Sequence, residues 1–95
     1  MKKEYIDPFI KILPVIDLHC ESKDSAVWLL ADFIKMNLKM KKYKLAVIHG
    51  KGYGIVRRGV HEYLSKDKRV KKYYIYGSND GLTIVELKTD SESER

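Results

Sequence analysis

Short apolar runs alternate with longer stretches of helical periodicity, and together they predict the order of the elements. Four strands are expected, at 12–19, 45–48, 70–76 and 82–88. Two helices are expected between them, because apolar residues recur there every three or four positions. The first helix is marked by Ala26, Leu29, Leu30, Phe33, Ile34 and Leu38, and the second by Val56, Val60, Tyr63 and Leu64.

The ends of these elements carry signals of their own. Ser22 is expected to cap the first helix, with Asp24 in the first turn, where the helix dipole favours an acid. Residues 77–81 (GSNDG) predict a turn that joins the last two strands as a hairpin. Residues 1–11 have no clear period and are expected to form an N-terminal arm, whereas 89–95 are expected to be a polar tail that frays.

The order strand, helix, strand, helix, strand, strand predicts a two-layer α/β (α+β) domain over residues 12–88. Parallel neighbours need a crossover connection, so the first two strands are expected to pair in parallel around the first helix. The continuous apolar run 45–48 is typical of a central strand. We therefore expect a mixed four-stranded sheet with both helices on one face and the other face open.

Composition excludes several classes of protein. A chain of 95 residues with 44% hydrophobic residues fits one small globular domain. Its single cysteine, Cys20, excludes an internal disulfide and a cysteine-based zinc site. No apolar run approaches the length of a membrane span, and no apolar segment of a signal peptide follows the first residues. A cytoplasmic location without membrane contact is expected, as a monomer or weak oligomer.

The net charge of +6 predicts an anionic partner, and nucleic acid or the ribosome surface are the first candidates. The charge is uneven, since 13 of the 19 basic residues lie between residues 35 and 73, together with only 2 acidic ones. Within this block, Lys39, Lys41 and Lys42 are predicted to bind nucleic acid. A run of charges is usually only a solvated face, so motifs must locate the site.

Polar residues follow the first two strands where each is expected to end. Asp17 and His19 close the first strand, and His49 opens a glycine-rich loop after the second. If the strands are neighbours, both histidines lie on one small patch at the carboxyl edge of the sheet. Imidazoles exchange protons near neutral pH, and Asp17 is placed to orient His19 or to help bind a cation.

The loop 49–54 (HGKGYG) has the features of a phosphate site. Gly50, Gly52 and Gly54 let the backbone approach a ligand closely, and the following helix directs its N–H groups at an anion. Lys51, Arg57 and Arg58 add cationic donors. The loop is neither a dinucleotide fingerprint nor a P-loop, and a sharp turn alone would also favour glycine. His61 is predicted to lie on a solvated helix face.

Three segments resemble the motifs of the small MutS-related (Smr) domain family: 16–19 (IDLH), 49–57 (HGKGYGIVR) and 81–87 (GLTIVEL). The family carries an LDxH-type motif, then HGxGxGxLR, then a GxTxVxL-like strand. The resemblance covers about residues 13–88. Two positions differ, since Cys20 stands where the family often has glycine and Val56 where it usually has leucine.

The resemblance implies a βαβαββ fold, similar to the C-terminal domain of bacterial initiation factor three. It also implies nucleic-acid binding, with nicking endonuclease activity on DNA or RNA. Because no ATPase accompanies the domain in this chain, the chain resembles the stand-alone members of the family.

One hypothesis is an endonuclease that cleaves a phosphodiester bond. On RNA, His19 and His49 would act as base and acid on the built-in 2′-hydroxyl, while Lys51, Arg57 and the loop amides stabilise the developing charge. On DNA, activated water would be required, with a divalent cation (Mg²⁺ or Mn²⁺) held near Asp17 and His19. Few carboxylates converge there, which favours RNA.

The alternative is a non-catalytic module that binds RNA, DNA or the ribosome. Tyr53, Tyr74 and Tyr76 are then predicted to contact nucleic acid, the last two by stacking bases on the open sheet face. Tyr73 is expected to pack into the core instead. A small-molecule phosphate enzyme is less favoured, because nothing in the sequence marks a dedicated apolar pocket.

Overall fold

Four strands and three helices follow one another along the described residues, 12–77 and 79–93, of this computed structural model. They are β1 (Val15–Asp17), α2 (Lys23–Lys39), β2 (Lys44–Ile48), α3 (Ile55–Lys66), β3 (Val70–Tyr76), β4 (Asn79–Leu87) and α4 (Asp90–Ser93). The predicted order up to β4 is confirmed. The exception is α4, which lies in the segment expected to be a fraying tail.

Ion pairs and a capping bond account for this short last helix. Lys41 Nζ lies 2.9 Å from Asp90 Oδ2, and Lys71 Nζ lies 2.9 Å from Glu92 Oε2. The backbone N–H of Thr89 also donates to Glu92 Oε1 at 2.8 Å. Ion pairs therefore tie α4 to the segment that follows α2 and to β3, contacts that the polar composition of the tail did not reveal.

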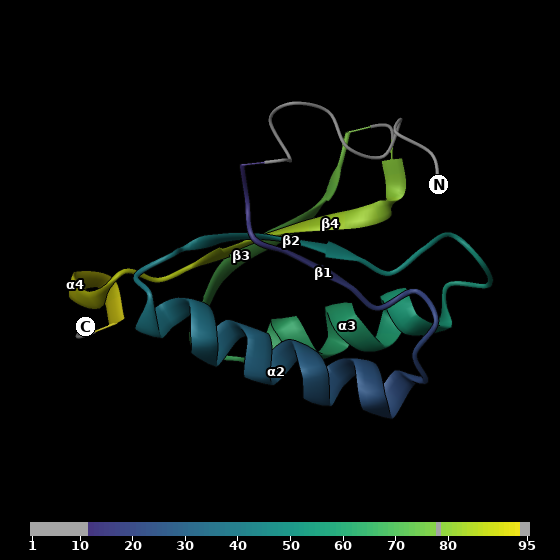
Figure 1. Ribbon diagram of the computed structural model, residues 1–95, viewed down its shortest axis with the longest axis horizontal. Helices are drawn as coiled ribbons and strands as arrows, with labels where there is room; N and C mark the ends of the chain where they lie inside the picture. The colour runs from purple at the N-terminus through teal and green to yellow at the C-terminus, as the bar shows by residue number, and fades with distance from the viewer. Residues whose placement is uncertain (1–11, 78, 94–95) are drawn as a thin grey trace.

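The sheet has the order β1-β2-β4-β3 and is mixed, as predicted. β1 and β2 are parallel, whereas β4 runs antiparallel to both β2 and β3. The helices α2 and α3 cover one face of the sheet (Figure 1). Because β1 and β2 are parallel neighbours, their carboxyl ends meet at one end of the sheet, where the loop between β2 and α3 begins.

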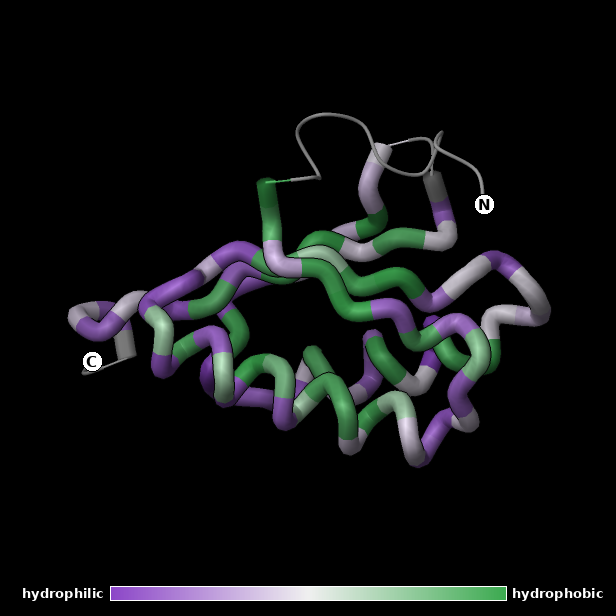
Figure 2. Tube along the Cα trace, viewed as in Figure 1, coloured by the Kyte–Doolittle hydropathy of each residue, from purple (hydrophilic) through white to green (hydrophobic). Residues whose placement is uncertain are grey.

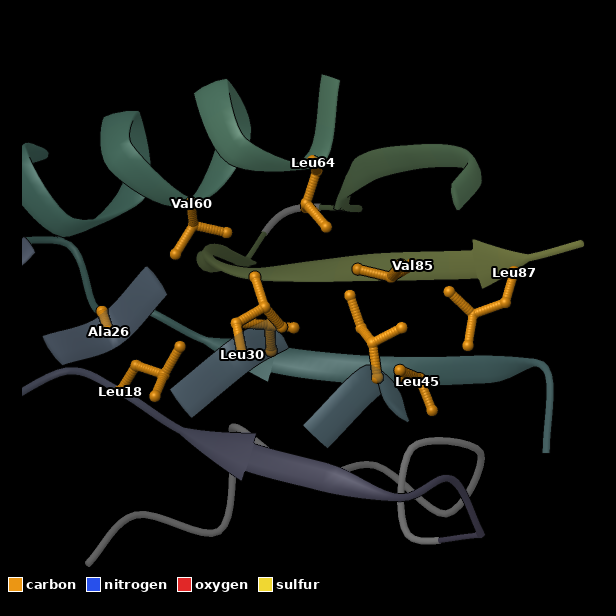
Figure 3. Close-up of a cluster of buried hydrophobic side chains, with 10 residues drawn as sticks. Leu18, Ala26, Leu30, Leu45, Val60, Leu64, Val85 and Leu87 are labelled. Atoms are coloured by element: carbon orange, nitrogen blue, oxygen red, sulfur yellow. The ribbon is translucent and has the colours of Figure 1, made fainter. Parts of the chain in front are cut away.

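Helix α2 begins where the sequence predicts. Ser22 is its N-cap, since its Oγ accepts a hydrogen bond from the backbone N–H of Ser25 at 3.2 Å. Its apolar stripe packs against the sheet and α3 to form the main core (Figure 3). The fully buried members of this core are Leu18, Ala26, Leu30, Ile34, Leu45, Val47, Val60 and Val85. Tyr73 packs against this core, as expected.

The face of the sheet away from the helices is not open at its centre, contrary to expectation. Ala46, Leu82 and Ile84 alternate with the residues of the main core, and each is at most 1% exposed. Leu13, Ile48 and Tyr76 pack against these three residues. In Figure 2 the hydrophobic colour follows the strands, whereas the loops at both ends of the sheet are largely hydrophilic. The domain therefore has a second, smaller core.

The hairpin forms between β3 and β4, but its turn is shorter than predicted. β4 begins at Asn79, and the pairing shifts abruptly from Ile75↔Thr83 to Tyr76↔Asn79. Residues 80–82 of β4 therefore bulge out of the ladder between β3 and β4. The Gly81 carbonyl accepts the N–H groups of His49 at 3.0 Å and Gly50 at 3.1 Å, which ties the bulge to the glycine loop. Among the described helices, none has the length and apolarity that crossing a membrane requires.

Candidate nucleic-acid site

The parallel pairing of β1 and β2 brings the two predicted site segments together. Asp17 pairs with Ile48, and the backbone N–H of Leu18 donates to the Ile48 carbonyl at 2.7 Å. Both segments therefore leave the sheet at the same end, beside the N-terminus of α3 (Figure 1). The expectation that the two strand ends are neighbours is confirmed.

Asp17 orients the His19 ring, as the sequence predicts. His19 Nδ1 lies 2.6 Å from Asp17 Oδ1, and the same oxygen accepts the His19 backbone N–H at 3.1 Å. An ionised carboxylate only accepts hydrogen bonds, so Nδ1 carries the proton of this pair. Nε2 has no hydrogen bond to any described residue. Both side chains are about half exposed, at 54% for His19 and 52% for Asp17. His19 therefore presents a free basic nitrogen to solvent.

Two of the three loop glycines are required by the backbone. Gly50 has φ +79°, and a Cβ there would lie 3.0 Å from the Cβ of His19. Gly54 has φ +78°, and a Cβ there would lie 3.2 Å from the Arg57 guanidinium. Gly52 has no left-handed φ and no neighbour within 4 Å of such a Cβ. Gly50 thus allows the loop to pack directly on His19, whereas Gly52 serves no comparable purpose.

Within the described residues, the N-terminus of α3 has no side-chain cap. Gly54 is the N-cap and offers no side chain, and the first turn carries no acid. Helices beginning in this way leave N–H groups available to an anion. A hollow of about 280 Å³ lies at this point, and His19, His49, the loop and the start of α3 line it. The predicted phosphate-binding glycines therefore adjoin the predicted base, His19.

Cationic side chains surround the loop, and one acid partly screens them. Lys51 Nζ lies 3.7 Å from Asp80 Oδ1, and Arg57 Nη1 donates to the Asp80 carbonyl at 3.4 Å. Asp80 belongs to the bulge of β4, which the sequence did not predict to reach the loop. An incoming phosphate would compete with the Asp80 carboxylate for Lys51. Arg58 is exposed one residue further along α3.

His49 is almost fully buried, although it directly follows the end of β2 and is predicted to donate a proton to the substrate. It is only 4% exposed, and both of its ring nitrogens have partners within the protein. Nδ1 donates to the Gly50 carbonyl at 3.1 Å, and Nε2 lies 2.7 Å from Thr83 Oγ1. Burial lowers the pKa of the imidazole below its ordinary value, and the Gly50 carbonyl opposes this only in part. The predicted role as acid stays a prediction, and this geometry favours a role in holding the loop.

The prediction that His61 lies on a solvated face is wrong. Its Nε2 lies 2.7 Å from Thr83 Oγ1, and its ring packs against those of His49 and Tyr73, with centroids 5.7 Å and 5.1 Å away. Burial, with His49 and Arg57 nearby, lowers the pKa of His61. The sequence favours a solvated position because His61 lies one helical turn after Arg57. It also directly follows the buried Val60, which the prediction did not take into account.

The protons of this network can be assigned from its partners. A carbonyl only accepts, so His49 Nδ1 carries a proton and the neutral ring accepts at Nε2. The Thr83 hydroxyl therefore donates to His49, and its oxygen accepts from Nε2 of His61. Thr83 is fully buried, and sequence reasoning missed it. The available signal was a threonine at an inward position of an apolar strand, because buried hydroxyls need partners.

The remaining predicted nucleic-acid residues are spread over the molecule. Tyr53 lies on the loop and is 95% exposed. Tyr74 and Tyr76 lie on the sheet face away from the helices, where Tyr76 packs on the second core. Lys39 is the last residue of α2 and Lys41 and Lys42 follow it, at the opposite end of the sheet from the loop (Figure 1). The structure therefore brings Tyr53 to the site, whereas the three lysines lie at the other end of the sheet and Tyr74 and Tyr76 lie on its other face.

A resident metal centre does not fit the donors near the loop. Asp17 and His19 bond to each other, and no group of three His, Cys, Asp or Glu residues is placed to hold an ion within the described part of the chain. Cys20, beside them, is exposed, and its backbone φ is not positive, so the position does not require glycine.

Comparison with known proteins identifies a family. The Smr domain model matches residues 16–88. Endonuclease MutS2 of Finegoldia magna is 41% identical over 76 residues, which are 77% of this chain and 10% of that protein. Endonuclease MutS2 of Geobacillus sp. strain WCH70 is 38% identical over 76 residues, with the same coverage. The chain thus spans about a tenth of the length of these relatives.

Solved structures show the same fold. The Smr domain of Thermus thermophilus MutS2 superposes with a TM-score of 0.78 at 25% identity, covering 80% of this chain and 99% of that one. YdaL, a stand-alone small MutS-related protein from Escherichia coli, superposes with a TM-score of 0.73 at 23% identity, covering 79% and 64% of the two chains.

Proposed function

The chain belongs to the Smr domain family, and on that basis we propose that it binds nucleic acid and cleaves RNA at the site formed by His19 and the glycine loop. One observation carries the proposal: Asp17 orients His19 beside an uncapped helix N-terminus and its glycine loop. The name endonuclease, given to the MutS2 relatives, supports phosphodiester cleavage. We propose RNA rather than DNA because of the chemical groups that the site offers.

The backbone phosphate would bind to the N–H groups of the loop and of the first turn of α3. Lys51 and Arg57 would neutralise the phosphate oxygens. Lys51 would give up its ion pair with Asp80 in order to contact the phosphate. These groups are fixed before the substrate arrives, so they stabilise charge that develops on the phosphate without reorganising. His49 supports the loop by donating to the Gly50 carbonyl.

His19 would then move the proton. Its free Nε2 removes the proton of the ribose 2′-hydroxyl, whose oxygen attacks phosphorus, and the bond from phosphorus to the 5′-oxygen breaks. The departing oxygen takes a proton from water or from a histidine. Asp17 stabilises the imidazolium that forms on His19. DNA has no such hydroxyl, and among the described residues no cluster of three potential ligands stands at the site to hold the metal that would activate a water.

The test is cleavage of labelled single-stranded RNA by protein freed of contaminating nucleases, in EDTA. We expect cleavage to continue in EDTA and to fall by about 100-fold or more in His19→Ala, the usual scale of a general base. Asp17→Asn is expected to lower the rate as well, because it removes the carboxylate that orients the ring and stabilises its imidazolium. Asp32→Asn removes an exposed carboxylate of α2 and serves as the matched control. Unchanged cleavage in His19→Ala, or complete loss in EDTA, would contradict the proposal.

One observation favours a second candidate function, a binding module without catalysis. Both ring nitrogens of His49 have partners within the described chain, so His49 is poorly placed to act as the acid that such cleavage would use beside His19. A module of this kind would bind RNA with a steep dependence on salt, because phosphate contacts release counterions. The same preparation would then bind RNA tightly at low salt and cleave none of it.

A further inference from the structure

A groove lies between α3 and the edge strand β3, next to the loop, and no predicted role accounts for it. It has a volume of about 580 Å³, within the range of small-ligand sites. Arg57, Arg58, His61, Glu62 and Ser65 of α3 line it, together with Tyr73 of β3. We propose that this α3–β3 groove binds one unpaired nucleobase of the RNA strand whose phosphate lies on the glycine loop, and that the protein therefore acts on single-stranded RNA. The inference rests on the proposed function.

The inner side of the groove consists of aromatic rings that the fold holds in place. The rings of His61 and Tyr73 lie 5.1 Å apart at an angle of 52°. His61 is fixed by its hydrogen bond to the buried Thr83, and Tyr73 packs on the main core. Rings fixed in this way lose little conformational freedom when a base packs on them, which favours binding.

The outer side adds an exposed aromatic ring and a planar cation. Tyr53 lines the groove and is 95% exposed, so nothing in the described chain covers its ring. Arg58 is exposed at the same rim. Tyrosine rings and guanidinium planes are the surfaces on which proteins stack unpaired bases. A base in the groove would therefore have flat partners from both sides.

The position of the groove relates it to the phosphate site. Tyr53 and Gly54 line both the groove and the smaller hollow at the loop, so the two are contiguous. Arg57 lines the groove, and its guanidinium approaches Gly54 on the loop. The groove is cationic at its loop end and carries Glu62 further along α3. A nucleotide with its phosphate on the loop would direct its base into the groove.

A paired base is a poor ligand for such a groove. Within a duplex, neighbouring bases cover both ring faces and the partner strand occupies the pairing edge. A base must leave the stack before side chains can contact its faces. The groove therefore selects for single strands, in addition to the 2′-hydroxyl that the proposed chemistry requires.

The first test compares adenosine 5′-monophosphate with ribose 5-phosphate, which differ only in the base, by amide NMR. We expect both compounds to shift the amides of residues 50–54, and only the nucleotide to shift those of His61, Ser65 and Tyr73. If both shift the loop and neither shifts the groove, the groove proposal is wrong and the phosphate site stands. If neither shifts the loop, the proposed function fails, and the groove proposal fails with it.

The second test measures binding of a labelled single-stranded RNA to the folded protein. Tyr53→Ala is expected to weaken binding about tenfold, the scale of one base stacked on an aromatic ring. Trp28→Ala is the matched control, because Trp28 is 70% exposed on α2, outside the groove. Equal affinity of wild type and Tyr53→Ala would overturn the proposal, as would a duplex of the same sequence that binds as tightly as the single strand.

Discussion

At the scale of single residues, the buried hydroxyl of Thr83 links the two histidines that lie behind the glycine loop. It lies fully buried between two imidazoles, donates to His49 and accepts from His61. His49 in turn donates to the Gly50 carbonyl, so the network extends from α3 through β4 to the glycine loop. The position of the loop therefore depends on a residue that has no contact with the solvent.

Replacing Thr83 with valine tests this network. The variant keeps the shape of the side chain but leaves Nε2 of both His49 and His61 without its partner. We expect the free energy of unfolding to fall by about 1–3 kcal/mol, the usual cost of an unsatisfied buried polar group, as measured by urea denaturation. Ser25→Ala, which removes an exposed hydroxyl of α2, is the control and should change little. Equal stability of the two variants would show that the network does not hold the loop.

The residues of the site differ in how far the sequence predicts them. Asp17 and His19 lie two residues apart on either side of the buried Leu18, so the sequence places them together, although β1 ends at Asp17 and His19 already lies in a turn. His61 could not be placed this way, because its partner Thr83 is distant in sequence and the register of β4 decides which side the threonine faces. The role of His49 depends on the same register.

At the scale of elements, the loop between β2 and α3 is the part that the sequence predicts best. The apolar run of β2, the glycines and the periodicity of α3 together indicate a strand, a turn and a helix N-terminus. The sequence alone does not reveal which glycines are required. Their spacing is regular, but only Gly50 and Gly54 take a left-handed backbone, and only Gly50 packs on His19.

Gly50→Ala and Gly52→Ala form a matched pair for this distinction. Alanine at position 50 is strained by φ +79° and by the 3.0 Å approach to His19 Cβ, whereas alanine at position 52 has open space. We expect Gly50→Ala to lower the free energy of unfolding by about 1–3 kcal/mol and Gly52→Ala to change it by less than about 0.5 kcal/mol. Urea denaturation measures both. If Gly52→Ala proves as destabilising as Gly50→Ala, the left-handed conformation is not what the loop requires.

At the scale of the whole molecule, the mixed sheet and its two covering helices follow from the order of the elements. Three features did not follow: the bulge of β4, the helix α4 and the covered second face of the sheet. Each depends on contacts between segments that lie apart in the sequence. The bulge is the most consequential for function, because it brings Asp80 to Lys51 and Arg57.

The basic residues, which the sequence groups into one block, lie at two ends of the domain. The longest dimension of the molecule is 39 Å, and the lysines after α2 lie at the other end from the loop. Lys41 is also paired with Asp90. The predicted binding by Lys39, Lys41 and Lys42 therefore requires a nucleic-acid strand long enough to reach from one end to the other, whereas the proposed cleavage requires only the loop and His19.

The central claim, that His19 activates the ribose hydroxyl of RNA held on the glycine loop, is tested most directly by the substrate itself. A single-stranded RNA is prepared with 2′-deoxyribose only at the nucleotide whose bond the protein cuts, and its cleavage is compared with that of the unmodified strand. We expect cleavage at that bond to stop, and the unmodified strand to yield a 2′,3′-cyclic phosphate. Continued cleavage at the deoxy position would show that water is the nucleophile and would contradict the account.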